Sequence, residues 1–75
     1  KGNQLARLRQ TVETSFDYVG DRFAEEARTR ARQAEEGQEP RGVYGEATLA
    51  EARDLLSDGI PVLPLPFRPK RLADG

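Results

Sequence analysis

The chain has 75 residues, 36% of them hydrophobic and 33% charged, and its twelve basic and thirteen acidic residues give a net charge of −1. It contains no cysteine and no histidine, which excludes a disulfide framework, a thiolate zinc site and a histidine-dependent catalytic triad within these residues. A domain this short buries little apolar surface, so we expect part of its stability to come from a partner surface or a second copy.

Charge and hydropathy argue against two further classes of protein. No run of about twenty apolar residues is present, so nothing in the chain is expected to span a membrane. A net charge this close to zero argues against a general nucleic-acid binder, because such proteins usually carry a basic face. The chain begins at Lys1 and has no methionine, from which we expect it to be a piece of a longer product.

Apolar residues recur at helical spacing through the first half of the chain. Their steps of three or four residues keep one stripe on a helix and predict a single helix over residues 4–33. Gly20 lies inside that range, and we interpret it as a point where another backbone approaches closely rather than as a kink. The stripe consists of Leu5, Leu8, Val12, Phe16, Val19, Phe23 and Ala27.

The second half of the chain predicts a loop and a short helix. Residues 34–47 are rich in glycine and charged side chains, which is typical of a loop. Thr48 and Glu51 then have the spacing of a capping box, which predicts a helix over residues 49–57. Gly59 is placed to adopt the left-handed conformation that ends such a helix, and a proline follows two residues later.

The segment over residues 60–67 is apolar but contains three prolines, which cannot donate the hydrogen bonds of a central strand. We predict an extended strap packed on the helices, although Leu63-Pro64-Leu65-Pro66 also resembles a peptide that docks in aromatic grooves. Residues 68–75 are expected to form a disordered tail.

The expected fold class is therefore mainly α, in a single small domain over residues 1–67. A long helix, a loop, a short antiparallel helix and the extended proline-rich strap would bury the apolar faces of both helices against one another.

Carboxylates recur every four residues along the first predicted helix, at Glu13, Asp17, Asp21 and Glu25. Such a stripe can hold a hard cation where carbonyls or a second element converge on it, and nothing in the sequence indicates either. A solvated face paired with arginines at helical spacing accounts for the stripe. We therefore expect no metal and no cofactor in this chain.

The residues also carry no recognisable catalytic constellation. Ser15 has no histidine to activate it. Tyr44 and Glu46, in a loop flanked by glycines, form the nearest thing to an exposed polar pair, and a loop pair without a pocket is a weak signal. We predict that the chain is not an enzyme.

Two sets of residues are candidates for binding. The aromatic stripe and the Tyr44 loop form the candidate interaction surface, which comprises Phe16, Val19, Phe23, Tyr44 and Glu46. Three arginines near the end of the first predicted helix are candidate phosphate contacts, although glutamates at helical spacing can neutralise them. These are Arg28, Arg30 and Arg32.

Three blocks of sequence are similar to a known family. They are residues 17–28 (DYVGDRFAEEAR), residues 42–48 (GVYGEAT) and residues 59–67 (GIPVLPLPF). In this order they resemble the bacterial family known as domain of unknown function 1178. The resemblance implies a bacterial, cytoplasmic protein with no assigned activity, and a zinc-ribbon-like segment with paired cysteines ahead of this region.

This sequence departs from the family pattern in one place. Relatives carry a histidine followed by Tyr-Gly shortly after the first block, whereas residues 29–41 contain no histidine and make a longer interval. A role that rests on that histidine is therefore not carried over.

We expect a non-enzymatic module for protein interaction or self-association, whose partner is another copy, another protein or the segment ahead of this region. The alternative is the C-terminal part of a zinc-ribbon regulator that contacts nucleic acid or the translation apparatus. That alternative rests on the resemblance and on the arginines.

Overall fold

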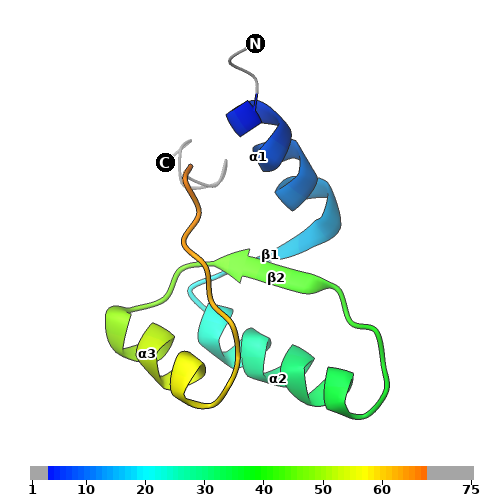
Figure 1. Ribbon diagram of the computed structural model, residues 1–75, viewed down its shortest axis with the longest axis vertical. Coiled ribbons are helices and arrows are strands. Elements are labelled where there is room, and N and C mark those ends of the chain that lie inside the picture. Colours follow the sequence, from blue (N-terminus) through cyan, green and yellow to red (C-terminus); the bar gives the residue numbers. More distant parts are fainter. Residues whose placement is uncertain (1–3, 68–75) are drawn as a thin grey trace.

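The computed structural model describes residues 4–67, and five elements follow one another along them (Figure 1). Helix α1 (Gln4–Ser15) leads directly into strand β1 (Phe16–Gly20), and a short turn joins β1 to helix α2 (Phe23–Glu35). Strand β2 (Gly42–Gly45) and helix α3 (Leu49–Ser57) complete the series. The tail predicted over residues 68–75 lies outside the described residues.

The prediction of a single helix over residues 4–33 is wrong, because β1 interrupts it. Phe16, Tyr18 and Val19 are aromatic or β-branched, and such side chains fit a pleated strand well. Gly20 has a φ of +59°, a left-handed conformation that the interior of a helix does not contain. The mainly α fold class is therefore corrected: the described residues form three helices and a small parallel sheet.

The sheet is a ladder of two parallel strands, in which α2 forms the crossover. Parallel strands cannot be joined by a tight hairpin, so the chain leaves β1, runs back through α2 and returns along β2. Helix α2 packs on both strands and on α3 (Figure 1). Phe16 is opposite Gly42 and Tyr18 is opposite Tyr44, and the register then shifts before Gly20 meets Gly45.

The two backbones approach closely where the ladder ends. A methyl group added to Gly45 would lie 2.3 Å from the Gly20 carbonyl oxygen. The Glu46 N–H donates a hydrogen bond to the same oxygen at 2.8 Å. The interpretation of Gly20 as a point of close approach inside a helix is therefore corrected: the crowded position is Gly45, whereas Gly20 is in a strand and has a positive φ, and a methyl group added to it would meet nothing closer than 3.8 Å.

Helix α3 has the bounds that the sequence predicts. The Thr48 hydroxyl accepts a hydrogen bond from the Glu51 N–H at 3.0 Å, and the Glu51 carboxylate accepts one from the Thr48 N–H at 2.9 Å. The capping box is thus confirmed. Gly59 has a φ of +83°, and the Ile60 N–H donates to the Leu55 carbonyl oxygen, which ends the helix as a left-handed glycine cap does.

The core of the described part is thin. Its buried apolar residues are Val12, Ala27 and Leu55, of which only Leu55 is completely buried. Residues 60–67 run from the end of α3 toward the α1 side of the molecule (Figure 1), where the Arg9 guanidinium lies 5.1 Å from the centre of the Phe67 ring. Side chains of this segment are half-buried at Ile60, Val62, Leu65 and Phe67.

Candidate functional site

The carboxyl ends of β1 and β2 and the amino ends of α2 and α3 lie together. Gly20 and Gly45 end the two strands side by side, and each is followed by a short turn into a helix. In parallel α/β structures, ligands bind at this edge, because the loops that follow the strands converge there. The side chains at this end of the ladder are therefore the first candidates for a site.

Two tyrosines and a glutamate form a cluster at this end. Tyr18 and Tyr44 are register partners, so their side chains project from the same face of the ladder. Their ring centroids are 5.3 Å apart and their planes are tilted by 58°. The Tyr18 hydroxyl donates a hydrogen bond to Oε2 of Glu46 at 3.1 Å. We call Tyr18, Tyr44 and Glu46 the tyrosine cluster.

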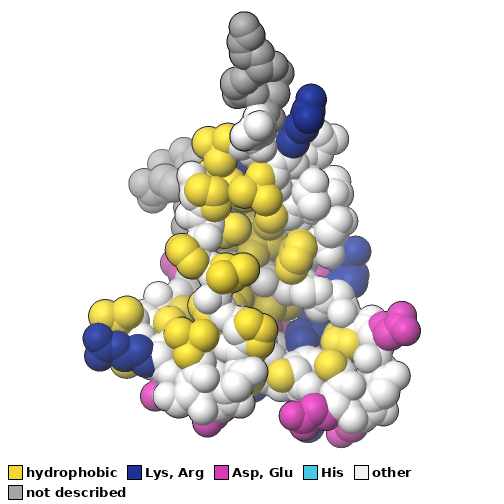
Figure 2. Space-filling view, in the orientation of Figure 1, with side chains coloured by type: hydrophobic (Ala, Val, Ile, Leu, Met, Phe, Trp, Pro, Cys, Tyr) yellow, Lys and Arg dark blue, Asp and Glu magenta, His cyan; other side chains and the backbone are white. Residues whose placement is uncertain are grey.

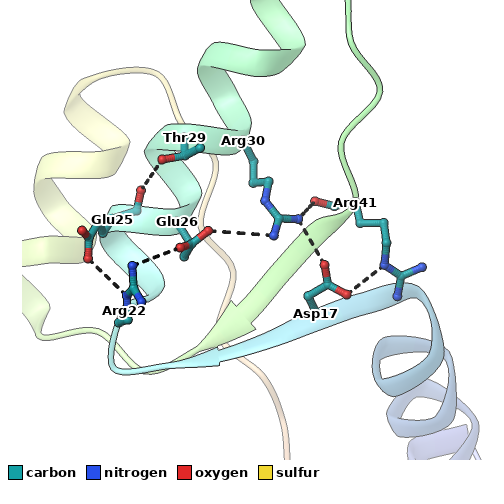
Figure 3. Close-up of polar contacts among 7 residues, drawn as sticks. All are labelled: Asp17, Arg22, Glu25, Glu26, Thr29, Arg30 and Arg41. Atoms are coloured by element: carbon teal, nitrogen blue, oxygen red, sulfur yellow. Dashed lines mark hydrogen bonds and ion pairs between the residues drawn. The ribbon is translucent and has the colours of Figure 1, made fainter.

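An open depression adjoins the tyrosine cluster. It is lined by Tyr18, Val19, Gly20, Arg22 and Glu26. The Arg22 guanidinium lies 3.5 Å from both Glu25 and Glu26, so the basic side chain in the depression is loosely held by two acidic ones (Figure 3). Gly20 leaves room beside the Tyr18 ring, because a methyl group there would lie 3.8 Å from the ring edge.

A second polar cluster joins β1 to α2 and to the segment before β2. The Asp17 carboxylate lies between Arg41, whose Nε donates to it at 2.9 Å, and Arg30, whose Nη1 donates to it at 3.3 Å (Figure 3). Arg30 also donates to the Arg41 carbonyl oxygen at 2.7 Å, and Arg41 donates to the Thr14 carbonyl oxygen at 3.0 Å. The hydrogen bonds from Arg41 and Arg30 hold the pKa of Asp17 below 3.8, although partial desolvation acts the other way.

This second cluster has a structural role. Its two arginine side chains both bind Asp17, each also donates to a backbone carbonyl group, and together they connect the start of the ladder to α2. The acidic stripe predicted on one helix is divided, because Asp17 lies on β1 and Asp21 in the turn after it. No group of three or more acidic side chains within residues 4–67 is placed to hold a metal ion.

The residues of the predicted interaction surface lie on three elements and in one turn. Phe16 and Val19 belong to β1, Phe23 begins α2, Tyr44 lies in β2, and Glu46 follows it. The Phe16 ring packs against Gly42, at the opposite end of the ladder from Glu46. The continuous helical stripe that motivated this surface is therefore absent, and only Tyr44 and Glu46 belong to the tyrosine cluster.

Tyr18 is the residue of the cluster that the sequence analysis missed. On a helix it lies off the apolar stripe, so helical spacing gave no reason to select it. The signal in the sequence is the pair of similar segments Asp17-Tyr18-Val19-Gly20 and Val43-Tyr44-Gly45. Tyrosine and valine favour strands, and a glycine beside them is typical of a bulge, a bend or a close approach of another backbone.

The three arginines proposed to contact phosphate are engaged by acidic side chains of the chain itself. Arg28 pairs with Asp58, and Arg32 lies 3.9 Å from Glu36. Arg30 pairs with Asp17 and lies 3.9 Å from Glu26. Each of the three cations is thus at least partly neutralised within the chain.

The fold and the site define a small α/β module with a polar and aromatic cluster at the carboxyl end of a parallel ladder. The family model described as "Protein of unknown function (DUF1178)" matches residues 2–70, and the chain belongs to this family. No curated protein and no solved structure matches it. The family resemblance is thereby confirmed, whereas the zinc-ribbon-like segment ahead of this region stays a prediction.

The helices of residues 4–67 include none that is both long enough and apolar enough to cross a bilayer.

Proposed function

We propose that this chain is a non-enzymatic protein-interaction module that associates through exposed leucines of α1 and of residues 60–67. The observation that supports this proposal most strongly is the imbalance between exposed and buried apolar side chains. Leu5 and Leu8 on α1 are 50% and 41% exposed, and Leu63 is 84% exposed. We call these three leucines the apolar face.

Hydrophobic side chains also gather over the elements that carry these leucines. Figure 2 shows such side chains along α1 and across the middle of the molecule, where residues 60–67 run in Figure 1. Single exposed leucines are ordinary, whereas a contiguous apolar region on a chain with a thin core is typical of an interface. A partner that covers this region would bury apolar surface and stabilise the fold, whose own core contains only Val12, Ala27 and Leu55 among the described residues.

Contact with nucleic acid has weaker support. The arginines that suggested it are ion-paired within the chain, and the net charge is −1. An electrostatic interface needs cations that are available to replace the counterions of the phosphate backbone. The bacterial and cytoplasmic setting implied by the resemblance belongs to the present proposal as well.

The proposal is tested by replacing leucines on α1 and, as a matched control, leucines on α3. The test variant is Leu5→Gln with Leu8→Gln, and the control is Leu49→Gln with Leu56→Gln, whose side chains are 68% and 55% exposed. Sedimentation equilibrium over a range of concentrations measures self-association relative to the 8.4 kDa monomer. Affinity isolation from the native cells, with and without nuclease, measures association with other proteins.

We expect the wild-type chain and the α3 variant to associate and the α1 variant not to associate. A monomer at every concentration, without any partner whose retention depends on the α1 leucines, would contradict the proposal. Partners that disappear on nuclease treatment would instead favour contact with nucleic acid.

A further inference from the structure

We infer that the tyrosine cluster binds the guanidinium or ammonium group of a basic side chain on a partner protein. The inference concerns the carboxyl end of the ladder and goes beyond the proposed function, which rests on α1 and residues 60–67. It is carried by three features: two tilted aromatic rings, a carboxylate that forms no ion pair within residues 4–67, and an excess of acidic residues in the segments that follow the two strands.

The two rings supply the aromatic part of the site. Tyr18 and Tyr44 are both half-buried, so their rings are held in place and still partly accessible. Organic cations bind to the faces of aromatic rings through the ring quadrupole, and tyrosine is one of the better partners. The two rings pack against each other, with centroids 5.3 Å apart and planes tilted by 58°, so a cation would bind to the ring surfaces turned away from this contact.

Glu46 supplies the charge. Its carboxylate accepts the Tyr18 hydroxyl at 3.1 Å, which occupies one of about four acceptor positions. Helix α3 does not use Glu46 for its cap, because Thr48 and Glu51 form the complete capping box. Within residues 4–67, Glu46 forms no ion pair with a basic side chain, whereas Glu25 and Glu26 both do.

The two segments that follow the strands are acidic. The seven residues that start at each strand end, 20–26 and 45–51, contain five acidic residues and one basic residue. Their net charge of −4 exceeds the roughly +0.5 that each of the two helix amino ends contributes. The acidic residues are Asp21, Glu25, Glu26, Glu46 and Glu51, and the basic one is Arg22.

This charge selects the class of ligand. A phosphate or carboxylate group would be repelled, and a metal ion lacks a converging set of acidic ligands within the described residues. A guanidinium or ammonium group matches both the ring faces and the Glu46 carboxylate.

A competing interpretation is that the Tyr18–Glu46 hydrogen bond only ties β1 to the turn after β2. Two variants separate these roles. Tyr18→Phe removes the hydrogen bond and keeps the ring and the carboxylate, whereas Glu46→Gln removes the charge. Glu39→Gln is the matched control, because Glu39 is exposed and forms no ion pair within residues 4–67.

The experiment is a titration of the full chain, followed by NMR, with acetyl-arginine amide and acetyl-lysine amide at constant ionic strength. Acetyl-citrulline amide is the neutral control for arginine, and tetramethylammonium represents a small cationic ligand. We expect saturable shifts at Tyr18, Tyr44 and Glu46 with the arginine or lysine probe. Glu46→Gln should weaken binding about two- to five-fold, as expected for a solvent-exposed charge pair, Tyr18→Phe should weaken it less than Glu46→Gln does, and Glu39→Gln should leave it unchanged.

Equal binding of the citrulline and arginine probes would overturn the inference, because charge would then play no part. Binding unchanged by Glu46→Gln would also overturn it, and so would equal losses in Glu46→Gln and Glu39→Gln. Binding of tetramethylammonium, but not of the arginine and lysine probes, would also overturn the inference, because the ligand would then be a small cation and not a protein side chain. None of these outcomes affects the proposal for the apolar face, which depends on other residues.

Discussion

Single residues determine how closely the two strands approach. Gly42 and Gly45 both lie in β2 at a φ that any residue can adopt, so backbone conformation does not explain either glycine. Space does. A methyl group at Gly42 would meet the Phe16 ring at 2.4 Å, whereas one at Gly45 would meet the backbone of Gly20. A side chain can rotate away from such a contact, and a backbone in a ladder cannot.

Gly45→Ala should therefore destabilise the fold more than Gly42→Ala. The added methyl group at Gly45 forces the strands apart and weakens the hydrogen bond between Glu46 and Gly20, at a cost of about 1–3 kcal/mol. Urea unfolding followed by circular dichroism measures both variants. A larger loss of stability in Gly42→Ala would show that the Phe16 ring is the more rigid neighbour.

Asp17→Asn should remove a contribution to stability that depends on pH. Folding lowers the pKa of Asp17 below 3.8, chiefly through the hydrogen bond from Arg41, so folding favours the carboxylate. This contribution is fully present above about pH 5 and is lost as the pH falls through the folded-state pKa. The difference in free energy of unfolding between wild type and variant should therefore be greatest near neutral pH and should shrink in acid.

Urea unfolding at several pH values tests this expectation, with Glu39→Gln as the control that changes a carboxylate outside any ion pair of residues 4–67. A difference between wild type and Asp17→Asn that is constant from neutral pH to about pH 3 would contradict it.

At the scale of elements, α3 is stabilised in two ways that involve different residues. The capping box and the glycine cap satisfy its ends locally. Leu55 fixes the helix to the rest of the fold, because it is the completely buried large side chain of the described part. Its neighbour Leu56 is 55% exposed on the same helix, which makes a comparison of the two informative.

Leu55→Ala should cost about 2–5 kcal/mol, because it removes buried methyl groups and leaves a cavity in a core with few other members. Leu56→Ala should change stability by no more than about 0.5 kcal/mol, as is usual at exposed positions. The measurement is the free energy of unfolding of each variant. Similar losses at both positions would show that Leu56 is covered in solution, which would point to association through α3.

At the scale of the whole molecule, stability is unevenly distributed. Helix α2 packs on both strands and on α3, whereas α1 packs chiefly on β1. Nearly all residues of the first two turns of α1 are exposed, and its buried residue is Val12 near its end. Regions with few buried apolar contacts open at low free-energy cost, and their amides exchange early.

Amide hydrogen exchange should therefore be fastest over residues 4–10 and slowest in α2 and the ladder. If α1 contributes to association, its protection should rise with protein concentration, while that of α2 should change little. Exchange followed by NMR at two concentrations makes this comparison. Protection of α1 equal to that of α2 in dilute solution would contradict the expected gradient.

The candidate site was predictable only in part. Tyr44 and Glu46 were selected because they lie in a short polar segment between glycines, and the structure places both in the tyrosine cluster. Tyr18 was not selected, because it joins them through the register of two strands that are distant in sequence. The arginines were recognisable as cations, but their ion pairs with Asp17 and Asp58 depend on how α2 packs.

The sequence alone determined α3, because its capping box and its glycine cap involve residues within a few positions of one another. It also determined the family, because the residues of the three blocks and their order can be compared with the family without knowledge of the structure. Only the tertiary structure decided between helix and strand at residues 16–20, since spacing by three and four residues suits a helix. The strand forms because Phe16 and Tyr18 pair with Gly42 and Tyr44, which lie beyond the α2 crossover. A local sequence pattern contains no information about this distant pairing.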